Sequence, residues 1–192
     1  MDVVSSWIPL VALLLWSLTP ALTSAETPMP DSVLDVVMDD IDGKPYALAQ
    51  HRGQVLMLVN VASRCGNTPQ YAGLEALYER FKSQGLVVIG IPANDFGAHE
   101  PGSNAEIAQF CSSTYHVSFP MLGKVSVKGD DMVPLYRYLT TKGPKPGDIT
   151  WNFAKFLVGR DGQVADRFDP KTKPDDLALV AAVQAALGKP GK

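Results

Sequence analysis

The sequence predicts a single α/β domain in which helices flank a mixed β-sheet. Apolar segments of strand length alternate with helical patterns along the middle of the chain, and a hairpin pattern followed by an apolar helix lies near its end. The chain has 192 residues, of which 46% are hydrophobic. That is enough for one compact domain with a substantial core.

The domain is expected to begin with a small hairpin and a buried strand. Residues 34–38 and 46–48 flank a turn at Asp42 and Gly43, which is a common hairpin sequence. Residues 54–60 are almost continuously apolar and predict a buried strand.

A helix is expected over residues 69–84, because apolar side chains recur there at helical spacing and Gly85 follows. Thr68 is expected to cap this helix and Pro69 to occupy its first position. Residues 86–91 predict a second buried strand.

The pattern Ser103-Asn104-Ala105-Glu106 is typical of a capping box and predicts a helix through about residue 114, with Cys111 in its last turn. Residues 153–158 and 163–168 predict a hairpin, and residues 174–187 a C-terminal helix. The order strand, helix, strand, helix, hairpin, helix predicts a thioredoxin-like fold, a central mixed sheet flanked by helices, here with an added N-terminal β-hairpin.

The N-terminal segment differs in character from the rest. Residues 7–18 are almost continuously apolar, and the small residues Thr23 and Ala25 suit cleavage after Ala25. We therefore expect a signal peptide over residues 1–25, a single domain over 26–192, and an exported protein, periplasmic or secreted. Asp2 and the lack of Lys or Arg before the apolar run are atypical, and an uncleaved anchor is the alternative.

Charge and histidine spacing argue against two classes of function. The net charge is −3 with mixed signs along the chain, which argues against nucleic acid as a partner. His51, His99 and His116 are isolated and match no metal-ligand spacing, so neither a metal nor another cofactor is expected. After cleavage of the signal peptide, no further apolar run is long enough to span a membrane.

Cys65 is the main candidate for a reactive residue, because it lies between an apolar strand and a helix start. The positive end of the helix dipole and the neighbouring Arg64 favour the thiolate, which is the nucleophilic form. Gly66 leaves room beside the sulfur. The alternative is a small buried residue at a strand end, but such junctions are where α/β folds place reactive groups.

Three segments around these elements resemble the glutathione peroxidase family, with cysteine where some members carry selenocysteine. They are NVASRCGNTPQY at residues 60–71, Asn94-Asp95-Phe96-Gly97 with residues 100–104, and Trp151-Asn152-Phe153. They occur in the family's order, and the similarity runs from about residue 34 to about residue 174.

The resemblance implies an enzyme, a peroxidase of the oxidative stress response that reduces hydrogen peroxide or organic and lipid hydroperoxides. Cys65 would attack the peroxide and become a sulfenic acid. Trp151 and Asn152 match residues that surround the sulfur in the family; the alternatives are a core aromatic and a loop asparagine.

Asp95 stands where the family has a glutamine. An ionised carboxylate accepts hydrogen bonds but cannot donate one, and it would repel a thiolate. Asp95 must therefore be protonated, point away or be replaced in function by Asn94. It is a site candidate, and a turn aspartate that caps local backbone is the alternative.

Cys111 falls where two-cysteine members that resemble this chain keep their resolving cysteine, whereas the other family position for a second cysteine is Ala93 here. A disulfide between Cys65 and Cys111 would then complete the first half of the cycle. We expect the two to be unbonded in the reduced fold and to meet when the helix over residues 103–114 unwinds locally. A permanent structural disulfide is the alternative.

The resemblance also implies a thioredoxin-like protein, or glutathione, as the reductant. Tetrameric members of the family carry extra structure in the segment that matches residues 139–151, which has no long insertion here, so the resemblance favours a monomer. Three other functions compete. A dithiol oxidoreductase would need Cys-X-X-Cys, but Thr68 stands where the second cysteine of that motif would be. A peroxide sensor or thiol-disulfide relay would use the same cysteine pair, and a binding module would hold it as a structural bridge.

Overall fold

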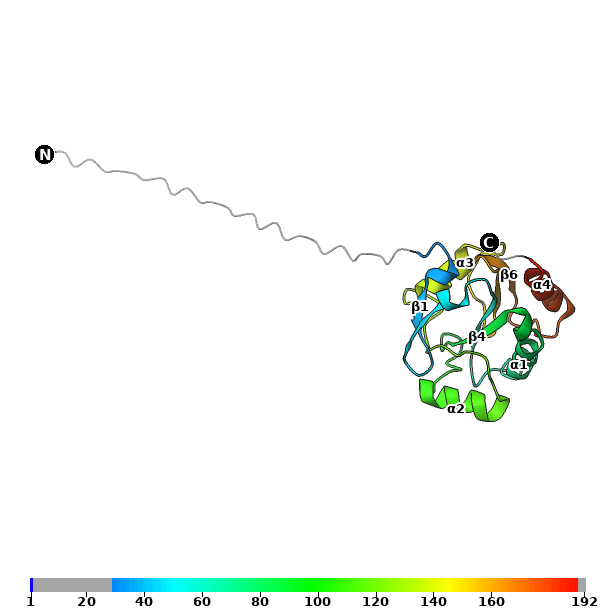
Figure 1. The fold of residues 1–192 in the computed structure, drawn as a ribbon. Coiled ribbons are helices and arrows are strands. Elements are labelled where there is room, and N and C mark those ends of the chain that lie inside the picture. The colour runs from blue at the N-terminus through cyan, green and yellow to red at the C-terminus, as the bar shows by residue number, and fades with distance from the viewer. Residues whose placement is uncertain (2–28, 190–192) are drawn as a thin grey trace.

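The computed structural model describes Met1 and residues 29–189, and residues 29–189 form one α/β domain (Figure 1). The expected signal peptide therefore lies almost entirely outside the described residues. The sheet has the order β4-β3-β5-β6. β3 (Val55–Val61) is parallel to β4 (Leu86–Pro92) and antiparallel to β5 (Lys155–Val158), which pairs antiparallel with β6 (Val164–Phe168). The predicted mixed sheet is confirmed.

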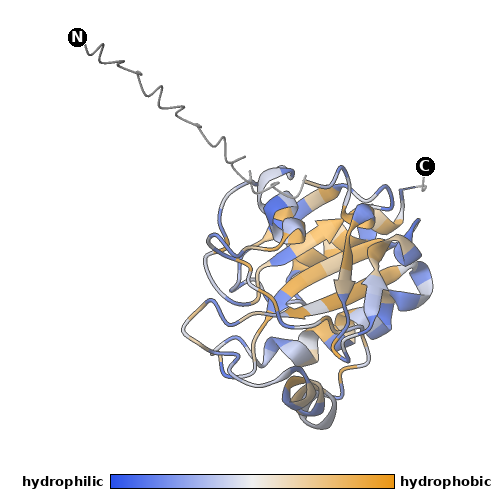
Figure 2. Ribbon diagram, turned by 90° about the vertical axis from the view of Figure 1, so that its left-hand side faces the viewer, coloured by the Kyte–Doolittle hydropathy of each residue, from blue (hydrophilic) through white to orange (hydrophobic). Residues whose placement is uncertain are grey.

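Both faces of the sheet are covered, because β3 and β4 are buried along their whole length. On one face the strands pack against α1 (Gln70–Phe81), α2 (Asn104–Tyr115) and α4 (Leu177–Leu187). On the other they pack against α3 (Pro134–Thr141) and the 3-10 helices η1 (Val33–Asp35) and η2 (Leu48–His51). Figure 2 shows the strands as hydrophobic elements at the centre of the domain.

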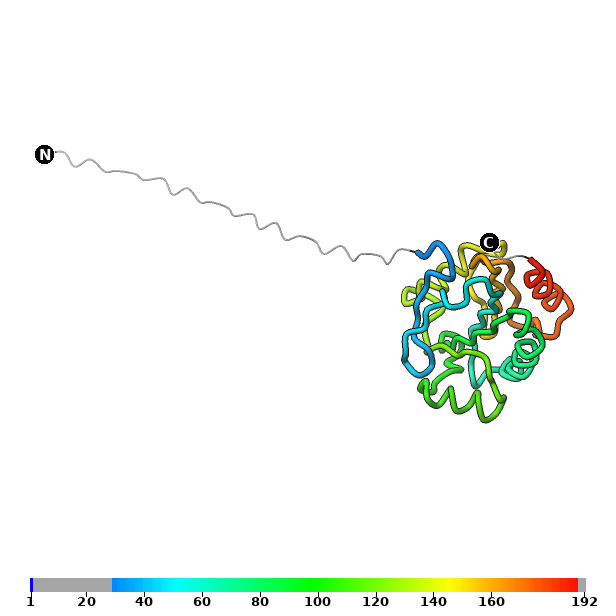
Figure 3. Tube along the Cα trace, in the orientation of Figure 1, coloured from blue at the N-terminus to red at the C-terminus, as the bar shows by residue number. Residues whose placement is uncertain are grey.

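The N-terminal hairpin is present as β1 (Val37–Asp39) and β2 (Pro45–Ala47), which pair antiparallel outside the main sheet. The chain trace shows this hairpin in blue and α4 in red on opposite sides of the domain (Figure 3). The hairpin is joined to the segment after α2, since the Asp39 carbonyl oxygen accepts a hydrogen bond from the Gly123 amide.

Helix α3 is absent from the sequence prediction. Pro134 occupies its first turn, which suits a helix start. Five of its eight residues are buried: Leu135, Tyr136, Tyr138, Leu139 and Thr140. The helix is amphipathic, but its eight residues make only about two turns, which is too short for the helical period to stand out in the sequence.

Two predicted helix starts need correction. The Thr68 side chain does not cap α1; Pro69 precedes the helix and no side chain caps it. The Thr68 hydroxyl instead bonds within the preceding loop. The C-terminal helix begins at Leu177 rather than at residue 174, because the Asp176 carboxylate accepts hydrogen bonds from the amides of Ala178 and Leu179.

The capping box at the start of α2 is confirmed, with Ser103 and Glu106 bonding to each other's backbone amides. The helix ends at Tyr115, one residue beyond the expected end. His116 follows in the left-handed conformation, with φ of 53°. Of the helices in the described part of the chain, none is long and apolar enough to cross a bilayer.

Candidate active site

Cys65 lies in the loop between β3 and α1, with 8% of its surface exposed. The Thr68 hydroxyl shapes this loop, since it accepts a hydrogen bond from the Cys65 amide (2.9 Å) and donates one to the Ala62 carbonyl oxygen (2.8 Å). The backbone amide of Asn67 donates to the Cys65 sulfur over 3.4 Å.

The three segments that carry the family resemblance meet around this loop. Asn60, at the end of β3, binds the third segment three times. Its side-chain amide donates to the Trp151 carbonyl oxygen, its side-chain oxygen accepts from the Ala154 amide, and its own carbonyl oxygen accepts from the Phe153 amide. Asn67 adds a fourth link by donating from its side chain to the Asn152 carbonyl oxygen (3.2 Å).

The second segment and the residue before Glu100 also bind this loop. The Arg64 amide donates to the His99 carbonyl oxygen (3.0 Å), and the Ser63 hydroxyl donates to the Glu100 carboxylate (2.7 Å). Backbone and side-chain bonds thus tie the Cys65 loop to both of the other segments.

Trp151 and Asn152 both lie beside this loop but in different environments. Trp151 is 41% exposed, and its ring contacts those of Phe96 (6.0 Å between centroids) and His99 (5.5 Å). Asn152 is fully buried and donates through Nδ2 to the Phe96 carbonyl oxygen (3.3 Å). Its Oδ1 has no hydrogen-bond partner among the described residues. A buried unpaired acceptor is costly, and such groups gather at functional sites.

Asp95 points into a neighbouring loop. Its carboxylate accepts hydrogen bonds from the Ser126 hydroxyl (2.6 Å) and the Val127 amide (3.1 Å). This is the arrangement of an aspartate that caps local backbone, one of the alternatives considered for it. Asn94 is also engaged, because its side-chain oxygen accepts from the Glu100 amide (2.8 Å).

Glu100 is a site residue that sequence reasoning missed. It is 1% exposed, and burial raises the pKa of its carboxyl group while the Ser63 bond opposes that rise. Oε1 accepts from Ser63, whereas Oε2 has no partner within the described chain. Its place within residues 100–104 was visible in the sequence, but its burial was not.

Asn60, Asn67 and Thr68 were also missed as functional residues. All three lie within the segment 60–71 that carries the resemblance. That segment was the available signal for them. Asn60 and Asn67 bind residues 94 and 85 positions away, which the sequence pattern does not contain, whereas the partners of Thr68 lie within six residues.

An open pocket of about 310 Å³ adjoins the Cys65 loop. The loop contributes Gly66 and Asn67 to its wall, and the other lining residues come from two further segments: Thr150, Trp151, Asp169, Pro170 and Lys171. A cavity of this size accommodates a group much larger than hydrogen peroxide.

Cys65 and Cys111 are both free thiols, as expected for the reduced fold. Cys111 is 1% exposed on the inner side of α2, where it borders the same apolar core as Cys65. Burial raises the pKa of the Cys111 thiol to about 11. The rings of Tyr71, Phe110 and Tyr115 pack against one another beside it, so Cys111 must leave this cluster to react.

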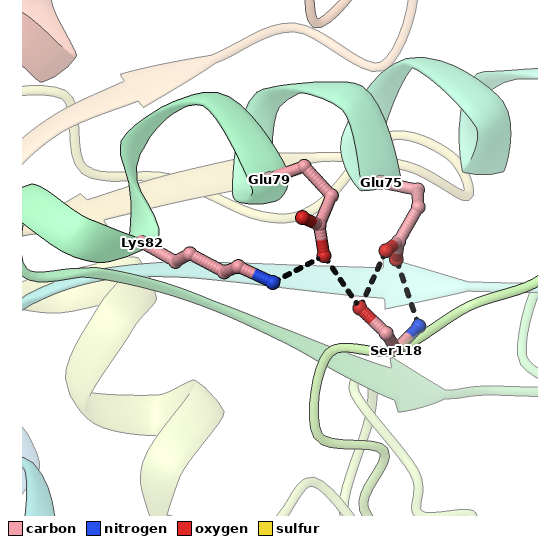
Figure 4. Close-up of polar contacts among 4 residues, drawn as sticks. All are labelled: Glu75, Glu79, Lys82 and Ser118. Carbon is pink, nitrogen blue, oxygen red and sulfur yellow. Dashed lines mark hydrogen bonds and ion pairs between the residues drawn. The ribbon is translucent and has the colours of Figure 1, made fainter.

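The segment after α2 is anchored to α1, as Figure 4 shows. The Ser118 amide and hydroxyl both donate to the Glu75 carboxylate (2.8 and 2.5 Å), and the hydroxyl also reaches Glu79 (3.2 Å). Lys82 in turn pairs with Glu79. These bonds hold Ser118, three residues beyond the end of α2, against α1.

Comparison with known protein families finds a match over residues 33–140 to the family described as glutathione peroxidase. Among curated proteins, the hydroperoxy fatty acid reductase Gpx2 of Synechocystis sp. is 50% identical over 161 residues, which cover 84% of this chain and 99% of that protein. The thioredoxin/glutathione peroxidase BtuE of Escherichia coli is 41% identical over 183 residues, with 84% and 100% coverage.

Comparison with solved structures agrees with these matches. The crystal structure of Trgpx in apo form superposes with a TM-score of 0.68 at 34% identity and covers 83% of this chain and 97% of that one. A thioredoxin-family thiol:disulfide interchange protein from Chlorobium tepidum superposes with a TM-score of 0.62 at 18% identity, with 85% and 100% coverage. The second likeness confirms the thioredoxin-like fold and, at that identity, nothing more.

Proposed function

The chain belongs to the glutathione peroxidase family and is a peroxidase, and from this premise we propose that Cys65 is its peroxide-reducing residue. The observation that carries the proposal is the convergence of the three resembling segments on the Cys65 loop, where a backbone amide donates to the sulfur. In the reaction the thiolate attacks one peroxide oxygen and the O–O bond breaks. The sulfur becomes a sulfenic acid, and the other oxygen leaves with a proton as water or an alcohol.

We propose that Trp151 and Asn152 act beside the sulfur. Trp151 is exposed enough to meet a substrate, and its indole N–H is a donor for a developing negative charge on oxygen. Asn152 has a second amide hydrogen besides the one bonded to Phe96. For Asp95, the bonds to Ser126 and Val127 support an indirect role in ordering the second segment rather than contact with peroxide.

The substrates proposed are hydrogen peroxide and organic or lipid hydroperoxides. The pocket beside Trp151 has room for an organic group, and the similar Synechocystis protein is described as a hydroperoxy fatty acid reductase. Hydrogen peroxide needs no such room, so both kinds of substrate fit the site.

Cys111 is proposed as the resolving cysteine. Its thiol sulfur would displace hydroxide from the Cys65 sulfenic acid, giving a disulfide and water. Burial keeps Cys111 protonated and enclosed in the fold described here, so the end of α2 must open first. The left-handed backbone of His116 supports opening at this end, because that conformation is unfavourable for a residue with a side chain.

The proposed reductant is a thioredoxin-like protein, with glutathione as the alternative. An intramolecular disulfide is a natural substrate for a dithiol protein. The name of the similar E. coli protein includes both reductants. Export after cleavage near Ala25, a single domain over residues 26–192 and a monomeric state also belong to this proposal. The apolar run at residues 7–18 supports export.

The test is to add hydrogen peroxide to reduced protein and follow both thiols by intact mass and peptide mapping, comparing wild type with Cys111→Ser. A rapid Cys65–Cys111 disulfide in wild type and a persistent sulfenic acid in the variant are expected. A disulfide already present without peroxide and resistant to mild reduction would make it a structural bridge. A disulfide that forms but is not turned over by thioredoxin or glutathione would favour a peroxide sensor or relay.

A further inference from the structure

Lys155 is a fully buried lysine on β5 for which the proposed chemistry has no use. Its ammonium group donates to the side-chain oxygen of Gln70 (2.5 Å) and to the carbonyl oxygens of Thr172 (2.6 Å) and Pro170 (3.2 Å). All three acceptors are uncharged. Lysine is rarely buried without a carboxylate partner, so its retention here calls for a specific reason.

The number of acceptors around the Lys155 head group equals the number of N–H donors on an ammonium group. An ammonium has three N–H donors and no acceptor, and this site offers three oxygen acceptors. A methionine or leucine of similar length would leave the Gln70 side-chain oxygen and the Thr172 carbonyl oxygen without this donor, and only the Pro170 carbonyl oxygen would keep another, the Gln70 side-chain amide. The site is therefore built around a lysine head group rather than around an apolar side chain.

The three acceptors lie in or directly next to segments that line the pocket beside Cys65. Gln70 is the first residue of α1, five residues after Cys65. Pro170 lines the pocket itself, and Thr172 closes the same turn through a hydrogen bond from its amide to the Asp169 carbonyl oxygen. Gln70 also donates to the Pro170 carbonyl oxygen (2.8 Å), so Lys155, Gln70 and Pro170 form a closed triangle.

Lys155 also lies close in sequence to the part of the pocket wall that Thr150 and Trp151 form. Lys155 follows the Trp151–Ala154 segment, whose backbone is held by Asn60 at the end of β3. A single buried side chain thus joins the start of α1, the turn over residues 169–172 and the strand that follows Trp151.

We propose that Lys155 is a positioning residue for organic hydroperoxides: it holds the 169–172 turn against α1 and so fixes the pocket wall that orients the organic group beside Cys65. The inference rests on the proposed function, because it assumes that Cys65 attacks the peroxide. Lys155 acts through the pocket wall and does not contact the reacting atoms. Hydrogen peroxide has no organic group, and its reduction does not depend on this wall.

The experiment measures the second-order rate constant for oxidation of Cys65 by cumene hydroperoxide and by hydrogen peroxide in wild type and Lys155→Met. Poor orientation is expected to slow the reaction with cumene hydroperoxide by about tenfold or more, while the reaction with hydrogen peroxide stays within about twofold. Lys82→Met is the matched control, because Lys82 is exposed and paired with Glu79. It is expected to leave both rates unchanged.

Gln70→Met keeps the inference testable if Lys155→Met does not fold, because it removes one acceptor and the bond to Pro170 but buries no new charge. Gln70→Met is expected to slow the reaction with cumene hydroperoxide selectively, but by less than Lys155→Met does. Equal loss with both peroxides in folded variants, or loss with neither, would overturn the positioning role. Failure of both peroxides to oxidise Cys65 in wild type would instead overturn the proposed function.

Discussion

The Asn67 side chain donates a hydrogen bond to the Asn152 carbonyl oxygen over 3.2 Å, while the Asn67 backbone amide donates to the Cys65 sulfur. One residue therefore fixes the distance between the proposed nucleophile and the segment that carries Trp151. The position of the amide that faces the sulfur depends on the side-chain bond.

Asn67→Ala is expected to slow oxidation of Cys65 by hydrogen peroxide by about tenfold, because the loop and its N–H donor lose their fixed orientation. The loss of stability is expected to be only about 1 kcal/mol, typical of one hydrogen bond. Stopped-flow oxidation and urea unfolding measure the two effects. Asn104→Ala is the control, since Asn104 makes a comparable bond to the Lys124 amide at the start of α2. If both variants slow the reaction equally, the special role of Asn67 is wrong.

Much of this domain could be predicted from the sequence because its strands are buried on both faces. β3 and β4 are continuous apolar runs, and the Asp161-Gly162 turn marks the hairpin between β5 and β6. The capping box at Ser103 is local and was found at its position. Helix α3 was missed because its eight residues make only about two turns, too few for a periodic pattern to stand out in the sequence.

From the sequence, the Cys65 loop and the third segment could be expected to lie together, and the hydrogen bond between Asn67 and Asn152 joins them; their chemical roles stay a proposal. Thr68 was expected as a helix cap, which is what its sequence position favours, but its hydroxyl bonds to Cys65 and Ala62 instead. Glu100 and Lys155 become informative only through burial and distant partners. These are tertiary properties that no local pattern contains.

Thr68→Val is expected to destabilise the protein by about 2–4 kcal/mol, because valine has nearly the same shape but leaves the Cys65 amide and the Ala62 carbonyl oxygen unpaired in a buried loop. Urea unfolding measures the effect. Thr141→Val replaces an exposed threonine on α3 and is expected to change stability by no more than about 0.5 kcal/mol. Equal effects of the two substitutions would contradict the structural role of the Thr68 hydroxyl.

Cys111 is expected to make stability fall at high pH. Its pKa in the folded protein is raised to about 11, above the ordinary value of 9.0, so between these values the unfolded chain loses a proton that the folded protein keeps. Unfolding free energy then falls with rising pH, by up to about 1.4 kcal/mol per pH unit. Comparing Cys65→Ser with Cys65→Ser/Cys111→Ala by urea unfolding at pH 8, 9 and 10 isolates the effect. Parallel curves would show that the pKa of Cys111 is not raised.

Lys155 is expected to make stability rise with pH, which is the opposite of the effect of Cys111. Burial lowers its pKa in the folded protein to about 7, from 10.5, and Asp169 opposes this fall. The Asp169 carboxylate also interacts electrostatically with Arg167 on β6. Between pH 7 and 10.5 the unfolded chain holds the additional proton, so wild-type stability relative to Lys155→Met is expected to rise with pH. Urea unfolding at pH 7, 8 and 9 measures the difference, and a flat or falling difference would contradict a lowered pKa.

Ser118 is expected to control how readily Cys111 reaches Cys65, because it fixes the chain just beyond α2 (Figure 4). Ser118→Ala removes the hydroxyl bonds to Glu75 and Glu79 but keeps the backbone bond to Glu75. A loss of about 1 kcal/mol in the local anchoring is expected to speed the disulfide step about fivefold after Cys65 is oxidised. Ser83→Ala, at an exposed position in the turn after α1, is the control. Quenching the reaction with a sulfenic-acid probe at successive times measures the rate. A slower disulfide in Ser118→Ala would mean that the anchor guides Cys111 toward Cys65 rather than restraining it.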